Sequence, residues 1–139
     1  MRRLAPLFGV SLLLAGCGGE RTVSPTAETV IGTVPTSTQA SVPAGDAKAG
    51  AKLFTAKGCD GCHVFTPAGS KGNIGPDLDK LAQYAKQANE DSLATFTFDS
   101  IKNPDSYVQP GYKGGLMPNF GQTLSDKQIA DLVAYLTKG

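Results

Sequence analysis

The stretch that decides the fold is CDGCH, residues 59–63. Two cysteines, Cys59 and Cys62, stand three positions apart, and His63, the only histidine of the chain, follows the second one directly. A third cysteine, Cys17, lies far upstream near the N-terminus. One short loop therefore contains the single histidine of the chain and both cysteines of its C-terminal part.

Three chemistries use a C-x-x-C pair. A redox dithiol usually opens a helix after a strand of a βαβ unit, and no such unit is visible around Cys59. A structural zinc site needs about four Cys, His or carboxylate ligands, and no second C-x-x-C pair is available. The third chemistry is covalent haem attachment, whose signature is C-x-x-C-H. The spacing therefore predicts thioether bonds at Cys59 and Cys62, with His63 as the proximal iron ligand.

A second axial ligand has to come from elsewhere, and the chain has no second histidine. Apart from Met1, the only methionine is Met117, in the glycine-rich segment GGLMPNF, residues 114–120. A methionine can also simply fill a gap in a core. The loop setting and the missing ligand favour Met117 as the second iron ligand. Ligation by His and Met raises the reduction potential and leaves no open iron position, which favours electron transfer over catalysis.

The first sixteen residues read as an export signal. Arg2 and Arg3 precede an uncharged run from Leu4 to Gly16. This run is too short for a confident membrane span, which needs about 20 apolar residues. The ending Leu14–Cys17 resembles a bacterial lipobox, which implies cleavage before Cys17 and lipid attachment to it. A plain signal peptide with a chance cysteine is the alternative, and the bare arginine pair is weak support for twin-arginine export.

Residues 17–45 predict a disordered tether, and residues 46–139 predict one folded domain. The tether is rich in Ser, Thr, Pro and Gly and lacks the apolar content of a core. The domain holds 10 Lys, no Arg and 10 Asp plus Glu, so its formal charge is zero. Long-range electrostatic steering of a partner should be weak. No basic patch suggests nucleic-acid binding.

Four helices are expected in the domain. Asp46 as N-cap and Gly58 as terminator predict a helix just before Cys59. Residues 125–139 carry a capping box at Ser125 and Gln128, followed by apolar residues at i, i+3, i+4 and i+7. Residues 77–88 predict a third helix. Residues 93–103 do not follow one period and have some strand character in T-F-T-F, but we expect a helix that ends before Pro104.

The motif order resembles that of a class I monohaem cytochrome c over residues 46–139. GAKLF precedes CDGCH, and Gly75-Pro76-Asp77-Leu78, Met117-Pro118 and DLVAYL follow. The resemblance implies an all-α fold of three to five helices around one covalent haem c. It further implies that the carbonyl of Pro76 accepts the Nδ1–H of His63. The first and last helices of the family cross at positions that map to Gly50, Phe54, Leu132 and Tyr135.

The resemblance also implies a function. It predicts a monomeric electron carrier, not an enzyme, and the lipobox-like ending at Cys17 adds an anchor to the outer face of a bacterial cell membrane. The carrier would accept electrons from a quinol-oxidising complex, in respiration or photosynthesis, and pass them to a terminal oxidase. The segment 103–120, NPDSYVQPGYKGGLMPNF, is similar to c-domains associated with haem–copper oxidases. The alternative is a haem-based sensor or a peroxidase-like haem enzyme.

Overall fold

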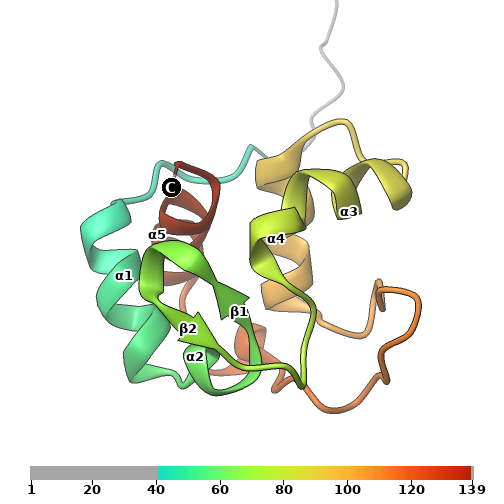
Figure 1. Cartoon of the computed structure of the whole chain (residues 1–139). Coiled ribbons are helices and arrows are strands. Elements are labelled where there is room, and N and C mark those ends of the chain that lie inside the picture. Colours follow the sequence, from blue (N-terminus) through green and yellow to red (C-terminus); the bar gives the residue numbers. More distant parts are fainter. Residues whose placement is uncertain (1–40, 139) are drawn as a thin grey trace, which may run out of the picture. The chain divides into compact units, whose positions relative to one another are not determined.

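The computed structural model describes residues 41–138, and the predictions for residues 1–40, including Cys17, lie outside this part of the chain. It contains the five helices α1 (Ala47–Ala56), α2 (Cys59–Cys62), α3 (Leu81–Gln87), α4 (Leu93–Lys102) and α5 (Asp126–Lys138). The mostly helical fold confirms the predicted class (Figure 1). A two-stranded hairpin of β1 (Val64–Phe65) and β2 (Ser70–Lys71), not expected from the sequence, follows α2. Short 3₁₀ turns complete the fold: η1 (Thr66–Ala68), η2 (Leu78–Lys80) and η3 (Phe120–Gln122).

The ends of α1 and α5 follow the predicted capping chemistry. The side chain of Asp46 accepts hydrogen bonds from the backbone N–H groups of Lys48 and Ala49, at 2.8 and 3.2 Å. After α1 ends, Gly58 takes the left-handed conformation with a φ of 73°, which glycine adopts without strain. At the start of α5, the N–H of Ser125 donates to Gln128 Oε1 at 2.9 Å. The N–H of Gln128 donates in return to Ser125 Oγ at 3.3 Å, so the predicted capping box is formed.

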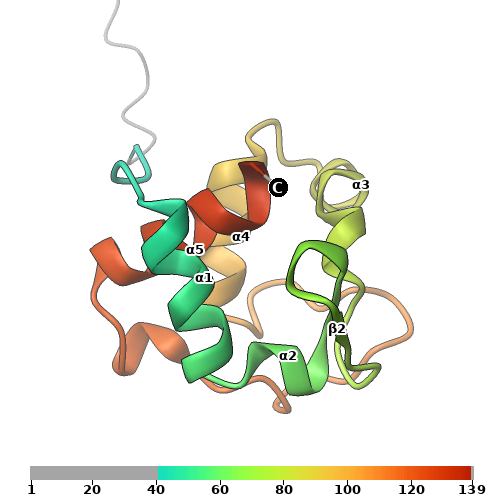
Figure 2. The same cartoon turned by 60° about the vertical axis from the view of Figure 1, so that its left-hand side comes forward.

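The crossing of α1 and α5 organises one half of the domain. Figures 1 and 2 show the two helices side by side. A Cβ atom at Gly50 would lie only 2.0 Å from the carbonyl oxygen of Asp131, so only glycine allows this approach. Phe54 and Tyr135 meet edge to face in the same crossing, with ring centroids 5.8 Å apart, a favourable geometry for aromatic pairs. The crossing at Gly50, Phe54 and Tyr135, with Leu132 buried beside it, confirms what the family resemblance implied.

A buried carboxylate links the start of α1 to the middle of α5. Asp131 forms an ion pair with Lys127, and its Oδ1 accepts the backbone N–H of Asp46 at 2.7 Å. The bond to Lys127 first, and then the bond from Asp46, hold the pKa of Asp131 below its usual value despite burial, because both favour the charged carboxylate. Since the folded pKa is lowered, this link contributes stability above the unfolded pKa and loses it as the pH falls through the folded pKa.

Contacts with α5 begin before Asp46. A Cβ atom at Gly45 would lie 1.9 Å from the carbonyl oxygen of Ala130, and Val42 packs against the main core cluster. The last residues of the segment predicted as a tether therefore already touch the folded domain. Among residues 41–138, no helix combines the length and the apolar character needed to cross a membrane.

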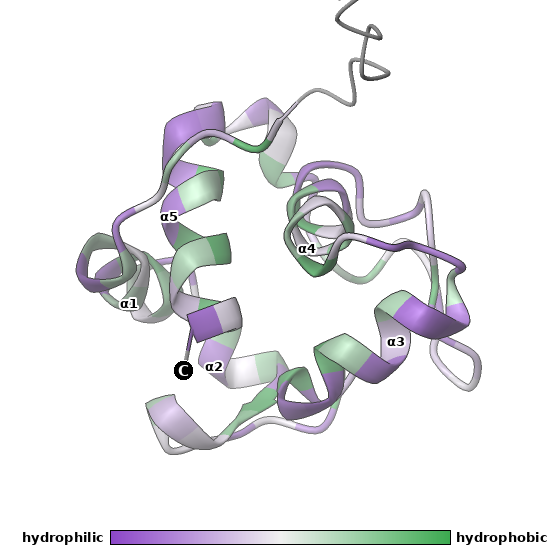
Figure 3. Cartoon of the chain, turned by 90° about the horizontal axis from the view of Figure 1, so that it is seen from above, coloured by the Kyte–Doolittle hydropathy of each residue, from purple (hydrophilic) through white to green (hydrophobic). Residues whose placement is uncertain are grey.

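The segment 77–88, predicted as one helix, is divided in the structure, and the segment 93–103 forms the expected helix. The first is divided into η2 and α3, with Asp77 capping η2. The second is the helix α4, as expected, although its apolar residues follow no single period. Phe98 and Ile101 belong to the core cluster around α5, whereas Phe96 packs with α3. Because α4 is buried on two sides, apolar residues surround much of it, and Figure 3 shows hydrophobic parts of α3, α4 and α5 facing one another.

Candidate functional site

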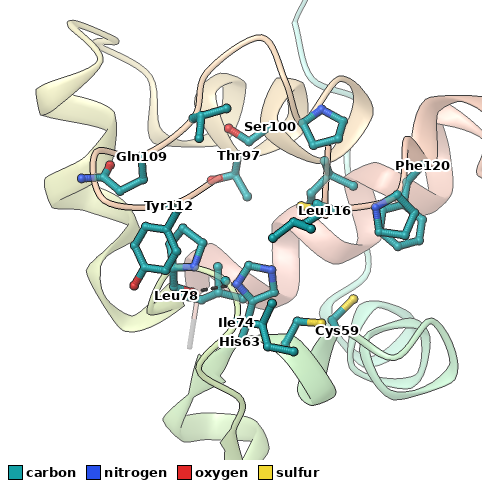
Figure 4. A pocket seen from close by; sticks show the side chains of 18 of the residues that line it. Cys59, His63, Ile74, Leu78, Thr97, Ser100, Gln109, Tyr112, Leu116 and Phe120 are labelled. Carbon is teal, nitrogen blue, oxygen red and sulfur yellow. Dashed lines mark hydrogen bonds between the residues drawn. The ribbon is translucent and has the colours of Figure 1, made fainter. Parts of the chain in front are cut away.

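A largely apolar cavity of about 330 Å³ lies between the α2 turn, α4 and the loop that precedes η3. Cys59, Cys62, His63 and Met117 all contribute to its walls. In Figure 4, Cys59 and His63 lie on one side of this space, and Thr97 and Ser100 of α4 lie on the other. The structure thus brings the four predicted haem-binding side chains to one cavity, although Met117 follows His63 only after α3 and α4 in the chain.

The CDGCH segment forms one helical turn that ends at the histidine. Cys59 and Cys62 are three positions apart on α2, so their side chains lie on neighbouring positions of one helix face. The backbone N–H of His63 donates to the carbonyl of Cys59 at 3.0 Å, and the chain then becomes extended. This geometry presents two thiols and one imidazole to the same cavity.

His63 is held in one tautomer by the backbone. Its side chain is buried, and its Nδ1 lies 2.7 Å from the carbonyl oxygen of Pro76. A carbonyl can only accept a hydrogen bond, so Nδ1 carries a proton, and in the neutral imidazole Nε2 then keeps its lone pair. A hydrogen bond of this kind orients a metal-binding histidine and raises its basicity. The position of Pro76 agrees with the role that the family resemblance implied.

Two glycines allow the segment after β2 to lie directly against this turn. A Cβ atom at Gly75 would be 2.4 Å from Cε1 of the His63 ring, and a Cβ atom at Gly72 would be 2.5 Å from the carbonyl carbon of Cys62. The N–H of Gly75 also donates to the carbonyl of Cys62 at 2.8 Å. Gly75 was recognised in the sequence as part of a motif, but its steric role was missed, and the Gly-Pro pair was the available signal.

The cysteines do not fit the two competing chemistries. Burial raises the pKa of the Cys59 thiol to about 11, whereas redox dithiols depend on a lowered pKa. In the part of the chain that the structure describes, no three Cys, His, Asp or Glu side chains gather closely enough to hold a metal ion. A site that supplies two thiols, one oriented imidazole and one thioether in an apolar cavity instead suits haem.

Met117 reaches the cavity from a loop. Its side chain is half-buried and packs against the core cluster, next to the strongly exposed Leu116. The following residue in the core is Phe120, which is buried at the start of η3. The loop thus enters the core three residues after Met117, and this contact sets the direction from which the Met117 side chain approaches the cavity.

Comparison with known proteins shows the family to which the chain belongs. The family model described as cytochrome c matches residues 47–139. The chain belongs to the cytochrome c family. It is 36% identical to cytochrome c of Guizotia abyssinica over 115 residues, covering 70% of this chain and 93% of that protein. It is 30% identical to cytochrome c6 of Limnospira maxima over 92 residues, covering 66% of this chain and 91% of that protein.

Membership of the cytochrome c family establishes the cofactor and the general function. The chain carries one covalent c-type haem and transfers electrons through it with redox partner proteins. Cys59 and Cys62 have the spacing of the two attachment cysteines. His63 and Met117 line the same cavity as these cysteines, and Pro76 holds the imidazole within it.

The contact between Gly75 and His63 leads to a prediction. Gly75→Ala places a methyl group against the imidazole ring, so the ring has to leave its position under Pro76. Overpacking of this kind costs about 1–3 kcal/mol. We expect the haem-loaded variant to lose about this much stability in urea unfolding and to show weakened low-spin character in its ferric absorption spectrum.

Gly61→Ala is the matched control, because a Cβ atom at Gly61 meets nothing within 4 Å. This variant adds the same methyl group to the same turn and should unfold like the parent protein. Equal stability and equal spectra for the two variants would show that Gly75 does not hold the histidine.

Proposed function

We propose that the protein is a one-electron carrier whose haem iron is ligated by His63 and Met117. The observation that carries this proposal is the hydrogen bond from His63 to Pro76, which frees Nε2 toward a cavity that Met117 also lines. The haem supplies the one-electron chemistry, because its iron alternates between the ferric and ferrous states. The chain supplies two ligands and an apolar wall that limits the access of water.

The ligand pair favours a carrier over a sensor or a peroxidase-like enzyme. A sensor or an enzyme needs an iron position that can accept a gas or a peroxide. His63 and Met117 together would take both axial positions of the bound haem and leave none open. Thioether sulfur is a soft ligand that stabilises ferrous iron, and so Met117 would raise the reduction potential. A raised reduction potential suits a carrier that passes its electron to an acceptor of high potential.

We further propose that the carrier is exported and works at the outer face of a bacterial cell membrane, held there by lipid at Cys17. The sequence Leu14–Cys17 and the long segment 18–45 that follows it support this arrangement. A tether raises the effective concentration of the domain near membrane-bound partners, which compensates for a domain without net charge. A quinol-oxidising complex as donor and a terminal oxidase as acceptor fit this location.

Replacement of Met117 tests the ligation. Met117→Ala should lower the midpoint potential by on the order of 0.1–0.3 V, within the range that axial ligands set. The variant should keep its haem, because Cys59, Cys62 and His63 remain. It should lose the weak red absorption band of a methionine–ferric bond and gain carbon monoxide binding in the ferrous state.

Asn119→Ala is the matched control, because Asn119 lies two residues after Met117, is exposed, makes no side-chain cap hydrogen bond at η3 and does not line the cavity. Its potential and spectrum should stay close to those of the parent. If Met117→Ala leaves both the spectrum and the potential unchanged, another group ligates the iron and the proposal of a His/Met carrier fails.

The lipid anchor has its own test. Protein purified from bacterial membranes should begin at Cys17 and carry the mass of attached acyl chains. Cys17→Ser should release the domain from the membrane fraction while its absorption spectrum stays the same. A native protein that is mainly unmodified at Cys17 and free of membranes would contradict the proposed anchor.

A further inference from the structure

The loop that carries Met117 connects α4 to η3, and its first half is attached to the rest of the domain. The ring of Tyr107 packs edge to face on Phe96 of α4, with centroids 5.5 Å apart. The hydroxyl of Tyr107 donates to Gln109 Oε1 at 3.1 Å, and Gln109 Nε2 donates to Gln87 Oε1 of α3 at 2.7 Å. Tyr107 and Gln109 therefore attach the first half of the loop, residues 104–109, to α4 and α3.

Asp105 joins the second half of the loop to this attached first half. The backbone N–H of Gly115 donates to Asp105 Oδ1 at 2.7 Å, across ten positions of sequence. Gly115 has a φ of 73°, a conformation that favours glycine. A Cβ atom at Gly114 would lie 3.1 Å from the same Oδ1. Within residues 41–138, no other side chain hydrogen-bonds to the backbone between positions 113 and 119.

The chain is fixed again shortly after Met117. Phe120 is 9% exposed in the core, and a Cβ atom at Gly121 would lie 2.6 Å from the carbonyl oxygen of Lys102 at the end of α4. Only residues 116–119 separate Gly115 from Phe120, and one of them is Pro118 with its restricted φ. The backbone position of Met117 therefore depends on two fixed points, one on either side.

We propose that Asp105 is a positioning residue for Met117: its carboxylate holds the turn at Gly114 and Gly115 so that the thioether stays directed at the iron. This inference rests on the proposed ligation by Met117. The hydrogen bond is exposed, so water competes with it and the fold does not depend on it. Its loss should therefore change how often Met117 leaves the iron and leave the global stability nearly unchanged.

The rate at which imidazole binds to the ferric holoprotein measures this opening, because imidazole can bind only after Met117 has left. We expect Asp105→Ala to raise the binding rate about two- to tenfold, the effect expected of one hydrogen bond. Asp105→Asn keeps an oxygen acceptor at the same position and should restore a rate close to that of the parent. Ser106→Ala is the control, because Ser106 Oγ donates to the Asn103 carbonyl in the same exposed turn and does not touch Gly115.

The same comparison in the Met117→Ala background shows whether Asp105 acts through the methionine. Without a thioether to displace, Asp105→Ala should leave the imidazole rate unchanged. An equal increase in both backgrounds would mean that Asp105 controls entry to the cavity, and this would overturn the inference. So would an unchanged rate for Asp105→Ala in the protein with Met117. A Met117→Ala spectrum identical to that of the parent would instead refute the proposed ligation itself.

Discussion

The hydrogen bond from His63 Nδ1–H to the carbonyl of Pro76 is the constraint on which the rest of the site depends. A histidine that follows two attachment cysteines could rotate or change tautomer, and then it could not serve as a fixed ligand. The 2.7 Å bond selects the tautomer in which Nε2 is free. The bond requires the backbone at Gly75 to lie against the imidazole ring, and this is possible only without a side chain. One short loop therefore determines the chemistry that the cavity can perform.

Packing among the helices positions the two sides of this cavity. Gly50 allows α1 and α5 to touch, and Asp131 connects the N-terminus of α1 to α5. Phe65 of the hairpin stacks edge to face on Tyr135, with centroids 5.3 Å apart, so the segment after the CDGCH turn joins the same cluster. On the other side, α4 packs against α3 and α5 and presents Thr97 and Ser100 to the cavity. The loop that carries Met117 starts where α4 ends.

The parts of the structure that could be predicted are those with a local or repeated signal, and the rest depends on contacts that no local pattern shows. The capping residues Asp46 and Ser125 mark the starts of α1 and α5, and Met117 was identified because it is the only methionine after Met1. Strands of two residues, such as β1 and β2, are too short to show an alternating pattern. The contact from Asp105 to Gly115 joins two positions of an exposed loop, and only the three-dimensional structure brings them together. The predictions for residues 1–40 concern a segment outside the described part.

The central claim is that His63 and Met117 ligate the haem iron. The proton NMR spectrum of the reduced protein tests this claim most directly. Labelling with ¹³C at methionine methyl groups is selective, because Met117 is the only methionine after Met1. A methyl group bonded through sulfur to low-spin ferrous iron lies over the porphyrin face, where the ring current shifts its signal far upfield. We predict one labelled methyl signal at such a position in the mature protein. A signal for Met117 among ordinary methionine methyl groups would contradict ligation by its thioether.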